Sequence, residues 1–146
     1  MALKSFKQFG DIVKKVAERN AVNYQQGMAT EIGGEVARLT PIDTGRATAN
    51  WQGSVNAPKL TPVKQYDKSA SATPTKKRLK KALSKSKIGD ILYVSNAVQG
   101  EDDNGAFTGE GYIQKLDTGE GSEQARYGMT GPTLARLKQL SRKVLK

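Results

Sequence analysis

Residues 40–51 read Thr-Pro-Ile-Asp-Thr-Gly-Arg-Ala-Thr-Ala-Asn-Trp, and the rest of the chain is organised around this stretch. It follows a long helical pattern and precedes the first predicted strand. Pro41 has no amide hydrogen to donate and biases Thr40 away from the helical region, so the helix must stop here. The chain therefore changes direction at this point.

The residues after the proline predict a turn. Asp43 and Thr44 have side chains that can bond nearby backbone amides, and Gly45 takes a positive φ at low cost. Arg46 offers a planar fork of donors, and Trp51 is a large apolar anchor with one N–H to satisfy. From the residue types alone, the stretch is a helix stop and a turn with the tryptophan in the core.

The order of these residues resembles the Thr-Pro-Val-Asp-Thr-Gly-Arg signature of the neck or tail-completion proteins of tailed bacteriophages. Later blocks are similar to the pattern of the same family, in the same order: Ser95-Asn96, Leu116-Asp117-Thr118-Gly119, Ser122-Glu123-Gln124-Ala125 and Gly128-Met129. The chain departs from the pattern where Arg126 replaces the usual proline and Asp117 the usual glutamate. The connection between Asn96 and Tyr112 is also longer than in typical members, and residues 57–87 are outside the resemblance.

The resemblance implies a virion subunit that forms a ring, sixfold or twelvefold, at the head–tail junction. Its partners would be copies of itself, the head connector or stopper, and the tail terminator or tube proteins. The genome would pass through the ring with non-specific contact, and assembly would take place in the host cytoplasm. The resemblance does not separate a tail-completion subunit from a tail terminator. We also hypothesise that Arg46 locks the turn on an acidic or carbonyl partner, Asp43 or Asp117 being candidates, with Trp51 packed beneath.

Composition excludes several classes of function. The 146 residues fit a single domain, 1–146, and include no cysteine and no histidine, which removes thiol nucleophiles, imidazole bases and the usual zinc sites. The scattered carboxylates, among them Asp43, Asp90, Asp117 and Glu120, form no recognisable catalytic pair or metal-ligand spacing. We therefore expect no enzyme, no cofactor and no metal. Because no apolar run approaches the roughly 20 residues that span a bilayer, we also expect no membrane partner.

The net charge of +10 is unevenly distributed. Residues 1–87 carry 17 cations against 6 anions, residues 88–131 carry 2 against 8, and residues 132–146 carry 5 against none. Such polarity suits nucleic acid, and it equally suits an assembly in which one subunit's acidic part meets the basic face of the next. Charge alone does not decide between the two.

The hydrophobic periodicity predicts an α+β domain with a long N-terminal helix, a small antiparallel β-sheet with long loops, and a C-terminal helix. The first helix covers residues 3–39, either as one bent helix or as two broken near Ala21. Most of its apolar stripe should pack on the sheet, although one end could project towards a neighbour. Strands are expected at residues 51–56, 88–96 and 112–117. Thr130 begins the closing helix.

Two charged segments are candidate interfaces. The first lies in the variable basic excursion, residues 57–87, where Thr75 could cap a short helix. Its cations, which would face DNA or a protein, are Lys76, Lys77, Arg78, Lys80, Lys81, Lys85 and Lys87. The second is an acidic hairpin tip that contains Glu101, Asp102 and Asp103, whose spacing does not fit an EF-hand. A nucleic-acid-binding protein is the alternative function, although no aromatic residue between Tyr66 and Tyr93 could stack on a base.

Overall fold

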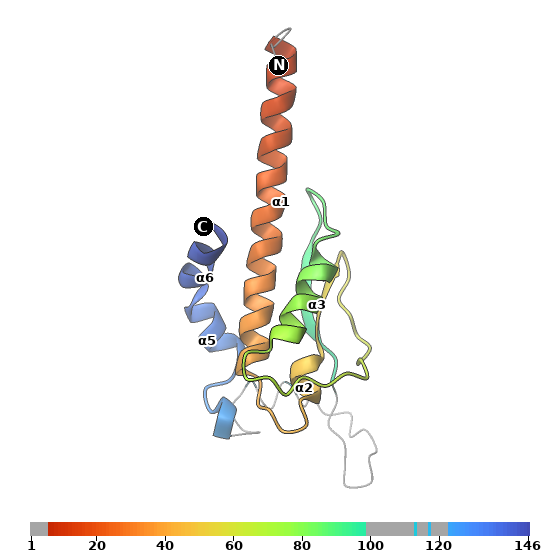
Figure 1. Ribbon diagram of the computed structural model, residues 1–146, viewed down its shortest axis with the longest axis vertical. Helices are drawn as coiled ribbons and strands as arrows, with labels where there is room; N and C mark the ends of the chain where they lie inside the picture. The colour runs from red at the N-terminus through yellow and green to blue at the C-terminus, as the bar shows by residue number, and fades with distance from the viewer. Residues whose placement is uncertain (1–5, 99–112, 114–116, 118–122) are drawn as a thin grey trace.

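The computed structural model describes residues 6–98, 113, 117 and 123–146. In chain order the elements are α1 (Phe6–Leu39), α2 (Arg46–Ala49), β1 (Trp51–Val55), α3 (Thr73–Leu83), β2 (Leu92–Asn96), the 3-10 turn η1 (Glu123–Ala125), α5 (Thr130–Ala135) and α6 (Leu137–Val144). Helix α1 passes through the middle of the molecule, with α3 and the strands on one side and α5 and α6 on the other (Figure 1). The predicted α+β class, with a long first helix and a small antiparallel sheet, is confirmed.

Helix α1 is continuous over 34 residues, which is the first of the two predicted alternatives. Its buried residues all lie between Thr30 and Ala37, where α3, the sheet, α5 and α6 surround it. The glycines there allow close packing, since a Cβ on Gly33 would lie 2.9 Å from Leu79 Cδ1. The other half projects beyond the rest of the domain (Figure 1). The prediction that most of the apolar stripe packs on the sheet is therefore wrong.

The two described strands pair antiparallel, with Trp51 opposite Asn96 and Val55 opposite Leu92. One face of β1 packs against α3, whose Leu79 and Leu83 are fully buried. The second strand is shorter than predicted because residues 87–90 form a turn. In this turn the Asp90 carboxylate accepts hydrogen bonds from the Lys87 backbone N–H and from Asn56 Nδ2.

Two predicted elements differ from the structure. The strand expected at residues 112–117 is wrong at both of its described residues, Ile113 and Asp117, which are helical. Ile113 packs against the core instead. The closing helix is two short helices, α5 and α6, separated at Arg136, whose ψ of 3° interrupts the helical path. At Arg136 the interruption coincides with a tertiary contact, since its guanidinium pairs with Glu35 of α1.

The core lies where the end of α1 meets the first strand and the segment before α5. Its buried members are mostly small, which brings the backbones of these segments close together: Val36, Ala37, Ala47, Trp51, Ala72, Ala125 and Met129. Trp51 is the largest side chain in this cluster, and only 7% of it is exposed. The predicted place of Trp51 in the core is confirmed.

Candidate functional site

The signature stretch forms a hydrogen-bonded hub around Thr40. The Thr40 hydroxyl donates to the Val36 carbonyl at 2.7 Å and accepts from Trp51 Nε1 at 2.8 Å, and Met129 Sδ lies 3.1 Å from the same oxygen. All of these groups are buried, so the one polar atom of the tryptophan is satisfied inside the core. The hub joins the end of α1, the start of β1 and the segment before α5.

Gly45 connects this turn to the basic excursion. Its φ is 82°, and a Cβ at this position would lie 2.7 Å from the backbone of Asp67. The Gly45 carbonyl accepts hydrogen bonds from the Ala49 and Asp67 backbone N–H groups at 3.1 and 2.9 Å. A side chain would be excluded both by the left-handed conformation and by this close approach. The prediction that glycine provides the turn is confirmed.

Asp67 is a buried carboxylate that holds α3 in place. One oxygen accepts from the Thr75 backbone N–H at 3.1 Å and from the Thr75 hydroxyl at 2.6 Å, and the other accepts from Ser69. Burial by itself would raise the pKa of Asp67, but these hydrogen bonds outweigh it and lower the pKa below its ordinary value. Thr75 therefore does not cap α3 as predicted; it lies within the first turn, and Asp67 satisfies its backbone amide.

Two asparagines complete the connections. Asn50, fully buried, donates to the Arg46 and Val63 carbonyls at 2.8 and 3.1 Å and accepts from the Val63 N–H at 2.6 Å. Asn96 donates to the Ala47 carbonyl at 2.8 Å. The excursion is thus attached to the signature turn at several points. Its composition had indicated a free surface loop, and that prediction is wrong.

Asp117 has a structural role near the start of α5. Its carboxylate accepts from the Met129 and Thr130 backbone N–H groups at 2.8 and 2.7 Å and from the Thr130 hydroxyl. These hydrogen bonds outweigh the effect of burial and lower the pKa of Asp117. Gly128 has a φ of 73°, and a Cβ there would overlap the Asp117 carbonyl oxygen. The proposed lock between Arg46 and an acidic partner stays a prediction.

The predicted motif residues divide into three groups. Thr40, Gly45, Trp51, Asn96 and Asp117 come together through the contacts above. Pro41, Asp43 and Thr44 lie at the rim of the turn, where Thr44 Oγ1 accepts from the Arg46 N–H at 3.3 Å. Arg46 begins α2, and Gly128 lies beside Asp117 as described above. Three further motif residues, Leu116, Gly119 and Ser122, and the predicted acidic interface residues Glu101, Asp102 and Asp103 lie outside the described part of the chain.

The projecting half of α1 exposes apolar side chains on one face. Phe6, Phe9, Val13 and Val16 follow one another at steps of three, four and three residues and are 97%, 52%, 50% and 40% exposed. At this spacing they form one stripe along the helix. We call these four residues the α1 stripe. No described part of the same chain covers it.

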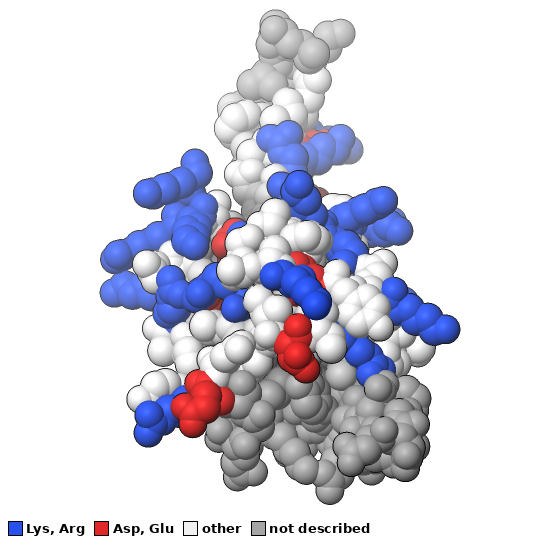
Figure 2. Space-filling model, turned by 60° about the horizontal axis from the view of Figure 1, so that its bottom comes forward, with Lys and Arg blue, Asp and Glu red and all other residues white. Residues whose placement is uncertain are grey.

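A basic groove of about 580 Å³ lies between α3 and α6, with α1 as its floor. Lys77 and Lys80 come from α3, and Lys143 comes from α6. Lys76 also lines it and pairs with Glu31 of α1 at 2.6 Å. Figure 2 shows Lys and Arg over both flanks of the molecule, with Asp and Glu confined to a few small areas.

Not every cation of the predicted basic run faces this groove. Arg78 points the other way, donating to the Ala49 carbonyl at 2.5 Å and to Thr75 Oγ1 at 3.2 Å. Burial lowers its pKa, and the nearby Asp67 opposes that effect. The assignment of Arg78 to an interface is therefore corrected, because its guanidinium joins α3 to α2. Lys81, Lys85 and Lys87 are exposed outside the groove lining.

A second hollow of about 440 Å³ adjoins the groove and shares Glu31, Lys76 and Lys143 with it. At its centre Glu35, only 7% exposed, accepts two hydrogen bonds from Arg38, at 2.8 and 3.0 Å, and pairs with Arg136. The hydrogen bonds from Arg38 hold the pKa of Glu35 below its ordinary value, against the opposing effect of burial. This acid joins α1 to the α5–α6 junction.

Within the described residues no group of three or more His, Cys, Asp or Glu side chains could hold a metal ion. None of the described helices is long and apolar enough to cross a membrane. Comparison with protein-family models, with curated proteins and with solved structures finds no match to this chain. The candidate site is therefore defined by two surfaces of the molecule, the α1 stripe and the basic groove.

Proposed function

We propose that this protein is a structural subunit that assembles into a ring at the head–tail junction of a tailed bacteriophage, and that it is not an enzyme. The α1 stripe is the observation that carries the proposal. A helix that leaves its own domain with two phenylalanines and two valines in water would expose an unusual apolar surface in a monomer. Such a surface is explained if a neighbouring subunit covers it.

The neighbour that best fits the stripe is a second copy of the chain. The polar faces of the projecting half, residues 6–21, carry four cations against two anions, whereas residues 88–131 of every copy carry a net charge of −6. A contact between unlike surfaces of identical subunits is heterologous, and it closes into a ring when the rotation between subunits allows. The charges would then favour one orientation of the neighbour.

The signature residues support the same proposal from the side of the fold. The resemblance to tail-completion proteins rests on residues that, in this chain, form the hub around Thr40 and its connections to Asp67 and Asp117. Their role is to fix the end of α1 on the sheet. A fixed base would let the projecting half reach a neighbour at a constant angle.

The test compares two double variants by light scattering at low and high salt, followed by negative-stain images. Phe9→Ser with Val13→Ser removes half of the α1 stripe. Asp11→Ser with Lys15→Ser places two serines on the opposite face of the same helix and leaves the net charge unchanged. We expect rings or a large oligomer from the wild type and the control, and a monomer from the stripe variant.

Circular dichroism must first show that both variants fold. A wild-type protein that stays monomeric at every concentration and salt, with a stripe variant that behaves identically, would contradict the proposal. An oligomer that the stripe variant forms as readily as the control would place the interface elsewhere.

A further inference from the structure

The basic groove has more positive charge than its own acids neutralise. Glu31 is paired with Lys76, and Glu35 with Arg38 and Arg136. Among the described residues, neither Lys77, Lys80 nor Lys143 forms an ion pair, although all three line the groove and are exposed. Two helices far apart in sequence thus place three ammonium groups without an ion pair around one concave surface, although the charge of Lys143 also helps to lower the pKa of the nearby Glu35.

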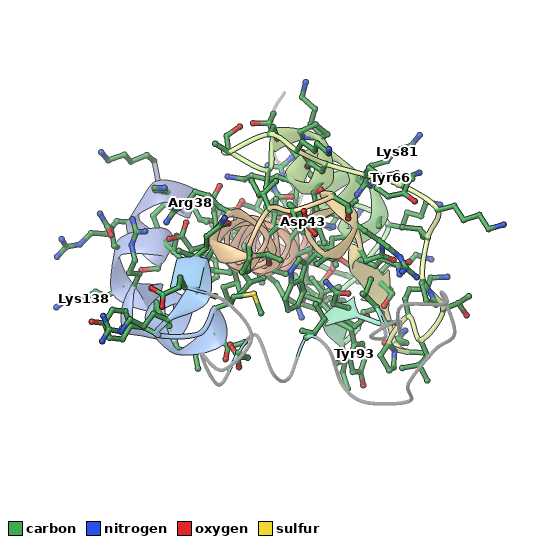
Figure 3. The ribbon with its side chains drawn as sticks, turned by 90° about the horizontal axis from the view of Figure 1, so that it is seen from below. Arg38, Asp43, Tyr66, Lys81, Tyr93 and Lys138 are labelled. Atoms are coloured by element: carbon green, nitrogen blue, oxygen red, sulfur yellow. The ribbon has the colours of Figure 1, made fainter. Side chains whose placement is uncertain are left out.

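The shape of the groove suits a chain of anions better than a single anion. It continues into the hollow around Glu35, so that cations follow the length of α1 from Lys80 towards Arg38. Two lysines outside the groove lining, Lys81 and Lys138, point away from α1 on opposite sides of the molecule (Figure 3). A small anion would contact only a few of these groups, whereas a polyanion would contact many.

The lining of the groove also indicates the chemistry of the occupant. Beside the lysines it presents uncharged donors such as Asn23 and Thr73, which suit phosphate oxygens. None of the described residues that line it is aromatic, so the described lining offers bases no surface to stack on. Recognition would depend on the backbone charge, which is denser along duplex than along single-stranded DNA.

From these observations we infer that the groove between α3 and α6 binds the sugar–phosphate backbone of duplex DNA, without sequence preference. Lys77, Lys80 and Lys143 contact phosphates, and the ion pairs of Glu31 and Glu35 hold the walls of the groove in place. The inference does not depend on ring formation, since every residue involved belongs to one subunit. It goes beyond the proposed function by assigning a DNA contact to particular side chains.

The experiment measures fluorescence anisotropy of a labelled DNA duplex of mixed sequence between about 50 and 200 mM salt. The groove variant carries Lys77→Gln, Lys80→Gln and Lys143→Gln. The control variant carries Lys59→Gln, Lys64→Gln and Lys68→Gln, three exposed lysines of the excursion that do not line the groove. Both variants lose three positive charges, so a difference between their DNA affinities shows that the position of the lysines matters.

We expect the groove variant to bind roughly a hundredfold more weakly at about 100 mM salt, and the slope of log affinity against log salt to fall by about 3. The control should lose only a fewfold. Lys80→Gln alone should reduce the slope by about 1, which keeps the test valid if the triple variant does not fold.

Three results would overturn the inference: no duplex binding by the wild type, equal losses in the groove and control variants, or tighter binding of a peptide with the sequence of residues 99–112 at the same groove. The mass of the protein, measured in the same buffer, separates this test from that of the proposed function. A monomer whose duplex binding depends on the groove lysines would support the inference even where no ring forms.

Discussion

The two ends of α1 contrast sharply. Around its last turn, polar groups of Thr40, Asp67 and Asn50 are buried and find partners within the chain, and the apolar side chains are covered. Around its first turns, Phe6 and Phe9 are exposed, and no described part of the chain packs on the helix there. One end is explained by the fold of a single chain, whereas the other end is not.

The difference separates the part of α1 that the fold of one chain explains from the part that it leaves exposed. A buried polar group without a partner costs about 1–3 kcal/mol, so the hydrogen bonds made by Thr40, Asp67 and Asn50 stabilise the folded chain itself. Exposed phenylalanines stabilise nothing in a monomer. The comparison predicts that substitutions near the end of α1 lower the free energy of unfolding. Substitutions near its start should instead weaken the proposed assembly.

The largest effect is expected at Trp51. Trp51→Ala removes the largest side chain of the core cluster and should lower the free energy of unfolding by about 3–5 kcal/mol. Trp51→Phe keeps most of the volume but leaves the Thr40 hydroxyl without its donor, and it should cost about 1–2 kcal/mol. Urea unfolding followed by circular dichroism measures both. A change below about 1 kcal/mol in Trp51→Ala would show that the hub does not hold the subunit together.

An intermediate effect is expected at Asp67. Asp67→Asn weakens the charge-assisted hydrogen bonds to Thr75 and Ser69 and should cost about 1–3 kcal/mol at neutral pH. The exposed Asp11→Asn is the matched control and should change stability by less than about 0.5 kcal/mol. Equal losses in the two variants would contradict the role of Asp67 in holding α3.

The same carboxylate gives stability a dependence on pH. Because the pKa of Asp67 is lower in the folded than in the unfolded chain, the unfolded chain binds more protons between the two pKa values. The stabilisation is therefore complete above the ordinary aspartate pKa of about 3.9 and is lost as pH falls through the folded value. Glu35 and Asp117, with pKa values lowered in the same direction, add to this loss. In the Asp67→Asn variant, the free energy of unfolding should fall less steeply as the pH is lowered below about 4.

The smallest effect on stability is expected at the exposed end of α1. Phe9→Ser with Val13→Ser should change the free energy of unfolding of the monomer by less than about 1 kcal/mol, because neither side chain is covered. Val36→Ala, in the buried half of the same helix, should cost about 2 kcal/mol. Hydrogen exchange of the monomer tests the same difference between the two halves of α1. Amides of residues 6–20 should exchange much faster than those of residues 30–39. Equal protection along α1 would contradict it.

The sequence predicted much of the fold because the relevant signals are local. Periodicity located α1, Pro41 located its end, and the β-branched and aromatic residues of 92–96 located a strand. Gly45 and Trp51 took the predicted roles because backbone conformation and side-chain size are properties of single residues.

What the sequence did not predict depends on residues that meet only in the folded chain. Asp67 stands in a stretch rich in Pro, Ser, Ala and Lys, and nothing near it indicates that it holds α3 eight residues later. In the sequence, Glu35 looks like any other polar residue of α1. Its role depends on the ion pair with Arg136, which is 101 residues away. The basic groove likewise needs α3 and α6 on one side of α1, which no local pattern encodes. The cations of the basic run and of the C-terminal helix were both recognised in the sequence, but their meeting around one groove was not predicted.

If the protein assembles as proposed, the exposed half of α1 would also affect how long an unassembled copy survives. Its 16 residues from 6 to 21 include Lys7, Lys14, Lys15 and Arg19, each a cleavage site for a trypsin-like protease. A helix of this length without packing opens often in water, so these peptide bonds become accessible to a protease. If a neighbour covers the helix, the same bonds are shielded. Assembled copies would then be protected from proteolysis. Unassembled copies would be cleaved first in the N-terminal half of α1.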